Sequence, residues 1–260
     1  MENRQKPTCF VRFAASDYLG SGCLIDGRIY KVSGDMYGDF DIAEQGYEID
    51  DVRLLPPCLP QKIICVGLNY AEHAAESTLS EIPAEPVLFF KPPSAMIGHD
   101  DNIIIPGWVD RVDYEGELAV VIGRELKNVS AKAAHDGIFG YTCVNDVTAR
   151  NIQKTDKQWT RAKGFDTFCP IGPYIVTDIV PDHLKIETRL NGKIVQQSNT
   201  DSMMNKPGAV ISFISKVMTL FPGDIISTGT PSGVGPMHPG DTVEVEIERI
   251  GVLKNGVAAQ

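Results

Sequence analysis

Residues 8–54 show a pattern of hydrophobic and polar positions that is typical of β-strands joined by tight turns. Short apolar runs, such as residues 9–13 and 28–32, are separated by turns that contain glycine and aspartate. Asp26-Gly27 lies between two such runs, and glycine accepts the positive φ that a two-residue hairpin turn requires. The pattern therefore predicts a small β-rich module.

A proline-rich segment, LPPCLP, follows at residues 55–60. Its three prolines remove backbone donors and fix an extended path, which is typical of a linker. We therefore predict two units, a β-rich module with its linker at residues 1–60 and a larger body at residues 61–260.

The body is predicted to be mostly strands. Apolar runs of strand length, many of them bounded by proline or glycine, occur at residues 62–67, 86–90, 102–105, 117–123 and 138–144, and more follow after residue 184. The pattern predicts a fold that is mainly β with few helices, in the α+β class.

Three segments of the body favour helices instead. These are residues 69–77, with Asn69 as the expected N-cap, residues 130–135, and residues 207–219. In the last of them, apolar residues recur at helical spacing, which indicates a face that packs on the core; they are Val210, Phe213, Ile214, Val217 and Leu220.

Composition narrows the classes of partner and the compartment. Hydrophobic residues make up 43% and charged residues 22% of the 260 residues, as in ordinary globular proteins. The formal net charge of −10 repels polyanions, so nucleic acid is not an expected partner. No apolar run approaches the roughly 20 residues that cross a membrane, so no membrane association is expected. The six cysteines form no C-x-x-C pair and several lie in strand-like runs, which favours buried free thiols in a reducing cytoplasm.

Two acidic residues open the apolar run at 117–123. Residues i and i+2 of a strand point to the same face, so Glu115 and Glu117 present two carboxylates side by side while Gly116 leaves the other face bare. Like charges that face a protein interior are costly unless a cation neutralises them or one keeps its proton. Taken alone, the pair is also compatible with a solvated strand start.

Asp146 adds a third carboxylate at the end of the next predicted strand. If the two strands are neighbours, the carboxylates of Glu115, Glu117 and Asp146 converge at one end of a sheet. A site with oxygen ligands only suits a hard octahedral cation, so the expected cofactor is Mg²⁺ or Mn²⁺ rather than Zn²⁺.

Two further segments carry candidate chemistry. His73 and Glu76 are three residues apart on a predicted helix and share a face, which is the arrangement of a general base as well as of an ordinary surface pair. The residues that follow, 77–85, would let this helix act as a lid. The loop at residues 227–235 offers backbone N–H groups and hydroxyls to an anion, but it lacks the lysine of a nucleotide-binding P-loop.

Six motifs, taken in order over residues 61–255, resemble the fumarylacetoacetate hydrolase family. The opening module is shorter than that of fumarylacetoacetase itself, so the resemblance points to the smaller bacterial members and the acylpyruvase-like branch. The motifs begin at Gly67, Pro86, Tyr114, Asn145, Ala162 and Thr228, and they read GLNYxxHxxE, PVLFFKP, YExEL, NDVTAR, AKGFD and TGTP.

The resemblance implies a roll of mixed β-sheets around the site, in a homodimer. It implies metal ligation by Glu115, Glu117 and Asp146, and catalytic roles for His73, Glu76 and Lys163. It also implies substrate contacts, which fall on Arg150, Gln153, Thr167 and Thr230.

The implied reaction is divalent-metal-dependent cleavage of a C–C bond in a small 2-oxo or 2,4-dioxo acid. Examples are the hydrolysis of an acylpyruvate or fumarylpyruvate and the decarboxylation of oxaloacetate. The alternative is an isomerase or decarboxylase of the 2-hydroxyhepta-2,4-diene-1,7-dioate type. All of these reactions pass through an enolate, whose charge a divalent cation stabilises.

Overall fold

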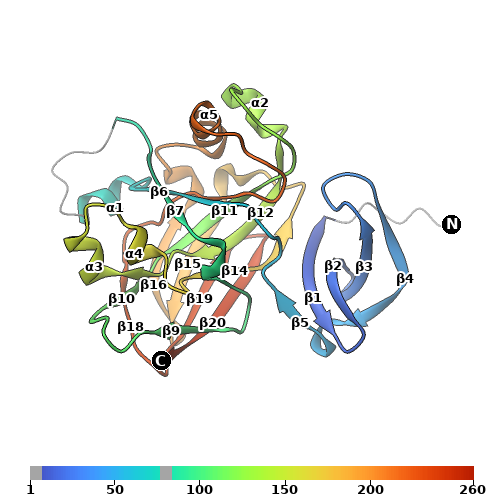
Figure 1. The fold of residues 1–260 in the computed structure, drawn as a ribbon, viewed down its shortest axis with the longest axis horizontal. Coiled ribbons are helices and arrows are strands. Elements are labelled where there is room, and N and C mark those ends of the chain that lie inside the picture. The colour runs from blue at the N-terminus through green and yellow to red at the C-terminus, as the bar shows by residue number, and fades with distance from the viewer. Residues whose placement is uncertain (1–7, 77–83) are drawn as a thin grey trace.

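The computed structural model describes residues 8–76 and 84–260 (Figure 1). Within them, strands dominate and the helices are few and short, so the predicted fold class is confirmed. The strands of the described residues form three sheets, of which two are mixed and the three-stranded one is antiparallel. Four short 3₁₀ turns lie at Ile49–Asp51, Pro93–Ala95, Pro181–His183 and Thr200–Ser202.

The largest sheet has twelve strands. Their order is β4-β3-β2-β1-β14-β12-β11-β17-β6-β7, with β5 beside β1 and β8 beside β14. Its strands are β1 (Cys9–Ala15), β2 (Tyr18–Ile25), β3 (Arg28–Gly34), β4 (Phe40–Glu48), β5 (Arg53–Leu55), β6 (Ile63–Gly67), β7 (Val87–Lys91), β8 (Met96–Ile97), β11 (Gly116–Ile122), β12 (Ile138–Asn145), β14 (Cys169–Val176) and β17 (Ile225–Ser227).

Two smaller sheets complete the body. One has the order β16-β15-β19-β20-β9 and the other the order β13-β10-β18. Their strands are β9 (Asn102–Ile105), β10 (Val112–Tyr114), β13 (Thr148–Ala149), β15 (Lys185–Leu190), β16 (Lys193–Asn199), β18 (Gly235–Met237), β19 (Thr242–Ile247) and β20 (Gly251–Ala259).

The opening module lies at one side of the molecule, in blue in Figure 1. The predicted hairpin joins β2 to β3, and both turn residues have positive φ, 50° at Asp26 and 80° at Gly27. The module shares the large sheet with the body through β1, whose Phe10 pairs with Ile175 of β14. The division of the chain at residue 60 stays a prediction.

The helices are α1 (Ala71–Glu76), α2 (Ala131–His135), α3 (Arg150–Thr155), α4 (Thr160–Lys163) and α5 (Pro207–Val217). Three of them lie where the pattern predicts helices, whereas α3 and α4 were not predicted. In α5, Val210 and Ile214 are buried as expected, but Val217 is 61% exposed, so its assignment to the core face was wrong. None of the helices within the described residues is long and apolar enough to span a membrane.

Asn69 is not the side-chain cap of α1. The amide of Ala74 donates to the carbonyl of Tyr70, so the first helical turn closes on Tyr70. The side chain of Asn69 instead donates to the carbonyls of Asn205 and Thr228 and accepts from the Asn205 amide. Asn69 thus fixes the chain before α1 to two distant loops.

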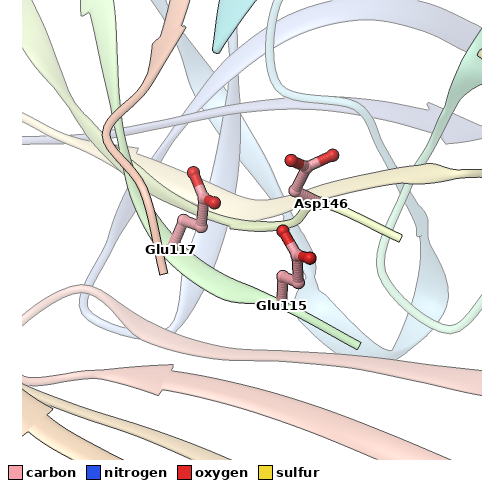
Figure 2. Close-up of side chains that lie close together, drawn as sticks. All are labelled: Glu115, Glu117 and Asp146. Carbon is pink, nitrogen blue, oxygen red and sulfur yellow. The ribbon is translucent and has the colours of Figure 1, made fainter. Parts of the chain in front are cut away.

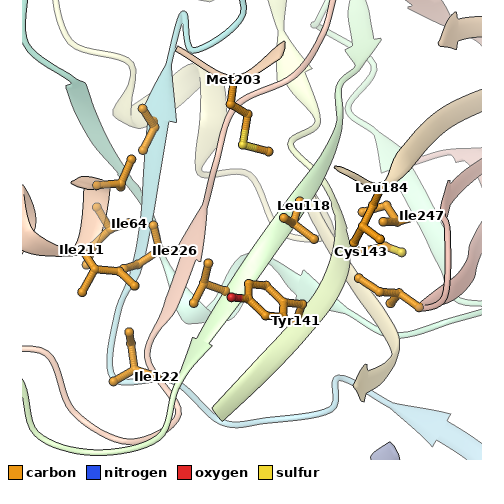
Figure 3. Close-up of a cluster of buried hydrophobic side chains, with 14 of the residues drawn as sticks. Ile64, Leu118, Ile122, Tyr141, Cys143, Leu184, Met203, Ile211, Ile226 and Ile247 are labelled. Carbon is orange, nitrogen blue, oxygen red and sulfur yellow. The ribbon is translucent and has the colours of Figure 1, made fainter. Parts of the chain in front are cut away.

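Strand β11 is the centre of the body and is buried along its whole length. Leu118 and Val120 pack into the cluster shown in Figure 3, which also contains Ile186 and Val245 from the five-stranded sheet. Ala119 and Val121 face a second cluster on the other side. The alternation of a strand therefore sends Gly116 toward the five-stranded sheet and Glu117 away from it.

At Gly116, strand β11 packs closely against the five-stranded sheet. A Cβ atom built at this position would lie 2.2 Å from Thr188 Oγ1 and 3.2 Å from Val245 Cγ1. The bare face predicted at Gly116 is therefore needed for β15 and β19 to pack against the strand that carries Glu117.

We expect Gly116→Ala to lower the free energy of unfolding by about 1–3 kcal/mol, because overpacking displaces well-packed neighbours. Urea unfolding in the absence of divalent metal measures this cost. Gly107→Ala is the control, since nothing lies within 4 Å of a Cβ atom at that position. Adding Thr188→Ala should restore most of the loss, because Thr188 Oγ1 has no hydrogen-bond partner among the described residues. An unchanged midpoint for Gly116→Ala alone contradicts the packing argument.

Candidate active site

The pairing of β11 with β12 brings three carboxylates together. The two strands are antiparallel, with Gly116 opposite Asn145. The Asp146 amide donates to the Glu115 carbonyl (2.8 Å), and the Glu115 amide donates to Asn145 Oδ1 (2.9 Å). Glu115, Glu117 and Asp146 are all buried, and each has a carboxylate oxygen within 4.8 Å of the others' (Figure 2).

Buried cations surround two of these carboxylates. Lys163 Nζ donates to Glu115 Oε2 (2.9 Å) and to Asp146 Oδ2 (2.6 Å), which joins the two ligand candidates. Arg150 Nη2 donates to Glu115 Oε1 (2.6 Å). Lys91 Nζ donates to Asp146 Oδ1 (2.6 Å) and to the Val147 carbonyl (3.0 Å).

These contacts decide the charge states of Glu115 and Lys163. Burial alone would raise the pKa of Glu115, but the positive charges of Lys163 and Arg150 outweigh it and hold that pKa well below its usual range. Burial would also lower the pKa of Lys163, yet the negative charges of Asp146 and Glu115 keep it above its ordinary value. Both groups are therefore ionised at neutral pH.

Glu117 differs from its two neighbours. Burial, together with the negative charges of Asp146 and Glu115, raises the pKa of Glu117 to about 8. Its Oε2 accepts from Ser227 Oγ (2.5 Å) and from the Gly229 amide (2.8 Å). The loop at residues 227–235, which the sequence suggested as an anion site, thus binds the carboxyl group of the protein's own Glu117.

The donor set fits a hard divalent cation. Each of the three residues offers oxygen, no nitrogen or sulfur ligand accompanies them in the group, and the raised pKa of Glu117 reflects negative charge that a cation would neutralise. Glu115, Glu117 and Asp146 would hold such an ion. The ligand chemistry suits Mg²⁺ and Mn²⁺ equally.

The candidate general base His73 and its partner Glu76 lie in the wall of the cavity that also contains the three carboxylates. His73 Nδ1 is 3.6 Å from Glu76 Oε2, beyond hydrogen-bond range, and it has no hydrogen-bond partner among the described residues. Glu76 accepts from the Gly233 amide (3.1 Å), and Glu72 accepts from Ser232 Oγ (3.2 Å). Helix α1 is therefore attached to the loop that also binds Glu117. Residues 77–83, most of the segment expected to let this helix act as a lid, lie outside the described residues.

A cavity of about 660 Å³ connects these groups. Arg150, Gln153 and Thr230 line it, in addition to the carboxylates, His73, Glu76 and Lys163. Its apolar wall includes Phe89 and Trp159, whose rings meet edge to face at 5.2 Å.

The predicted substrate contacts have different surroundings. Arg150 uses all three guanidinium nitrogens within the protein, for Asp113, Gln153 and Glu115. The Thr230 hydroxyl donates to the Gly116 carbonyl and accepts from Gln196 Nε2. Thr167 does not line the cavity, and its hydroxyl accepts from the Ile104 amide (2.8 Å).

Two contributors were missed from the sequence. Lys91 is buried against Asp146, and a lysine within an apolar strand was the signal, because a buried ammonium requires a partner. Asp113 is buried between Arg111 and Arg150 (2.7 Å and 2.8 Å). It precedes the glutamate pair by two residues, but nothing in the sequence revealed its two arginine partners.

The fold and the cavity define the class of protein, a β-rich enzyme with a buried carboxylate triad at the end of its central strand. The protein-family model described as fumarylacetoacetate hydrolase, C-terminal, matches residues 62–258. A second family model, described as Rv2993c-like, N-terminal, matches residues 10–57. The chain therefore belongs to the fumarylacetoacetate hydrolase family, as the motifs indicated.

Relatives in this family carry different activities in their names. A mitochondrial oxaloacetate tautomerase of Bos taurus is 46% identical over 216 residues, which cover 78% of this chain and 68% of the relative. The structure of a 2-hydroxyhepta-2,4-diene-1,7-dioate isomerase from Mycobacterium marinum matches with TM-score 0.91 and 44% identity, covering 97% of this chain and 99% of the other. A maleylpyruvate hydrolase from Sphingobium sp. SYK-6, solved with manganese(II) and pyruvate, matches with TM-score 0.81 and 30% identity over 96% and 99% of the two chains.

Glu115 is ionised at neutral pH, whereas the raised pKa of Glu117 favours its protonated form. Substitution by glutamine should therefore have different effects at the two positions. Glu117→Gln resembles the protonated acid, so we expect the metal-free protein to keep its melting temperature and lose its stabilisation by Mn²⁺. Glu115→Gln removes one of the two carboxylates that Lys163 and Arg150 each contact, so it should destabilise the metal-free protein by about 1–3 kcal/mol. Thermal unfolding with and without Mn²⁺ tests both expectations. Full Mn²⁺ stabilisation of Glu117→Gln removes Glu117 from the ligand set.

The pKa of about 8 at Glu117 also predicts how metal affinity depends on pH. Below this pKa a cation must displace the Glu117 proton, so Mn²⁺ affinity should rise about tenfold per pH unit between pH 6 and 8 and level off above. In the metal-free protein, Glu117 binds its proton more tightly in the folded state than in the unfolded state. The free energy of unfolding should therefore fall as pH rises from about 4.5 through 8. Calorimetry at pH 7 in buffers of different ionisation enthalpy should detect close to one proton released per Mn²⁺ bound. A flat affinity profile contradicts this assignment.

Proposed function

We propose that this protein is a divalent-metal-dependent enzyme that moves a proton on a small 2-oxo acid by way of its enolate, as a tautomerase or isomerase. The observation that carries the proposal is the position of Lys163. Its ammonium joins two of the three candidate metal ligands and lines the same cavity as His73. A permanent positive charge and a candidate base therefore serve one substrate site.

The chain's own residues supply most of the steps. Lys163 stays protonated and is 2% exposed, so its charge stabilises negative charge on the substrate with little screening by water. His73 takes the proton from the carbon next to the 2-oxo group, and Glu76 beside it stabilises the imidazolium that results. The imidazolium then returns the proton to the enolate oxygen in a tautomerase, or to another carbon of the conjugated chain in an isomerase, which restores the neutral base. A divalent cation held by the triad would supply a Lewis acid for the 2-oxo oxygen. Mg²⁺ and Mn²⁺ are both proposed.

The apolar wall of the cavity supports the same chemistry. Phe89 and Trp159 keep water away from one side of the site. Negative charge that develops there interacts more strongly with Lys163 and Arg150 than it would in water, because the surroundings screen it less. The two relatives at 44–46% identity bear isomerase and tautomerase names, which also favours proton transfer.

C–C bond cleavage is the second candidate, and a specific observation favours it. His73 Nδ1 has no hydrogen-bond partner among the described residues and lines the cavity, so it is available to activate a water molecule. Hydrolysis of a 2,4-dioxo acid would use that water, whereas decarboxylation of oxaloacetate needs no base. The relative named as a hydrolase supports this reading at 30% identity. A homodimer in the cytoplasm stays a prediction.

Oxaloacetate separates the roles of His73 and Lys163, because one substrate reports both tautomerisation and loss of CO₂. His73→Ala should lower the tautomerisation kcat by roughly 10²–10⁴, the contribution of a positioned base, while any decarboxylation falls much less. Lys163→Met should lower both by on the order of 10²–10³. Enol absorbance and CO₂ release measure the two reactions.

His183→Ala is the matched control. His183 also pairs with a carboxylate, that of Asp201 at 2.8 Å, but it is 79% exposed and does not line the cavity. This variant should keep both rates. Equal losses of tautomerisation and decarboxylation in His73→Ala would show that His73 positions the substrate and is not the base.

A further inference from the structure

Three cations form a row that leads from the triad to the mouth of the cavity. Side-chain exposure rises along it, from 2% at Lys163 to 14% at Arg150 and 47% at Arg111. Asp113 links Arg111 to Arg150, and Glu115 links Arg150 to Lys163. Arg111 is therefore connected to Glu115 through three ion pairs, by way of Asp113 and Arg150, and lies at the open end of the same cavity.

Arg111 keeps N–H donors that have no partner among the described residues, whereas every guanidinium nitrogen of Arg150 donates to the protein. Arg111 places Nε and Nη2 on Asp113, at 2.7 Å and 2.9 Å, and among the described residues its Nη1 has no partner. A guanidinium carries five N–H donors, so most of this group remains available. Arg150, in contrast, donates from every nitrogen to the protein.

A second cation lies at the same end. Lys154 follows Arg150 by four residues on α3, so the two side chains share a face of the helix. Lys154 lines the cavity, is exposed, and makes no ion pair within the described residues. The backbone connects the two sides of the mouth, because the Arg150 amide donates to the Arg111 carbonyl (2.9 Å).

We propose that Arg111 and Lys154 form a subsite for a second carboxylate, so that the substrate is a dicarboxylic 2-oxo acid. This inference rests on the proposed function, which places the 2-oxo acid group at the triad. The distal carboxylate then lies at the mouth of the cavity, whose wall also includes Phe89 and Trp159. A monocarboxylic 2-oxo acid leaves Arg111 and Lys154 without a ligand.

Ion pairing alone does not account for this arrangement. Arg161 makes the same two-point contact with Asp156, at 2.8 Å and 2.6 Å, but outside the cavity lining. It shows what an arginine that only neutralises an aspartate looks like here. Arg111 combines that contact with a place in the cavity wall, which it shares with Lys154, a lysine that makes no ion pair with any residue in the described part of the chain.

Two unreactive ligands with one head group test the subsite. N-oxalylglycine and N-ethyloxamate both carry the oxamate group that mimics a 2-oxo acid, but only the first has a distal carboxylate. Calorimetry on the full chain loaded with Mn²⁺, at low ionic strength, should show N-oxalylglycine binding about tenfold more tightly, the effect of one charge-assisted contact. Because the mouth is exposed, added salt should reduce this preference.

Substitutions then assign the preference to residues. Arg111→Gln and Lys154→Gln should each reduce it several-fold and together remove it, with the Kd of N-ethyloxamate unchanged. Arg161→Gln and Lys157→Gln, which alter a matched arginine and an exposed lysine outside the cavity lining, should leave it intact. N-ethyloxamate also guards against misfolding of the variants, since it needs only the triad.

The possible failures are distinguishable. If wild-type protein binds both ligands equally, the subsite is wrong and the proposed function stands. If the preference survives in the double variant, Arg111 and Lys154 are not its source and the assignment is overturned. If neither ligand binds the Mn²⁺-loaded protein, the proposed function itself fails and the subsite fails with it.

Discussion

Burial of charge around the end of β11 is the constraint on which the rest of this structure depends. Taking a carboxylate out of water costs several kcal/mol unless opposite charge and hydrogen bonds replace the lost hydration. The protein offsets this cost with a row of side chains whose charges alternate in sign. Each side chain inside the row contacts one of opposite charge on either side. The members, in order, are Arg111, Asp113, Arg150, Glu115, Lys163, Asp146 and Lys91. Glu117 stands outside this alternation and receives hydroxyl and amide donors instead.

The packing of the sheets follows from that arrangement. Two glutamates on one face of a strand require the intervening position to face the opposite side, where β15 and β19 pack. Only glycine leaves enough room there. The carboxylate site and the packing of the two sheets therefore depend on consecutive residues of β11. The register between β11 and β12 then brings Asp146 to the pair. A slip by one residue would turn the glutamates into the core between the sheets.

Periodicity predicted the parts of this structure that depend on neighbours in sequence. The i, i+2 spacing of Glu115 and Glu117, the strand that ends before Asp146 and the Asp26-Gly27 hairpin are all local patterns, and the structure shows each of them. Helices α3 and α4 were missed because they are less than two turns long and begin after Ala149 and Trp159, which offer no capping side chain to mark a helix start. The role of Thr167 stays a prediction; its hydroxyl accepts from the amide of Ile104, a contact between distant residues that local spacing does not reveal.

The loop at residues 227–233 serves two structures at once, and this limits how the protein can evolve. Its first half binds Glu117 through Ser227 and Gly229, and its second half holds α1 through Ser232 and Gly233. An insertion or deletion here would disturb the carboxylate triad and the His73 helix together, so changes in this loop are tied to each other. Lys154, on α3 at the mouth of the cavity, does not hold two parts of the structure in this way. Divergence in substrate range among homologous chains is therefore expected to accumulate at exposed positions of α3 such as Lys154, and not at Arg150, while the loop stays constant in length.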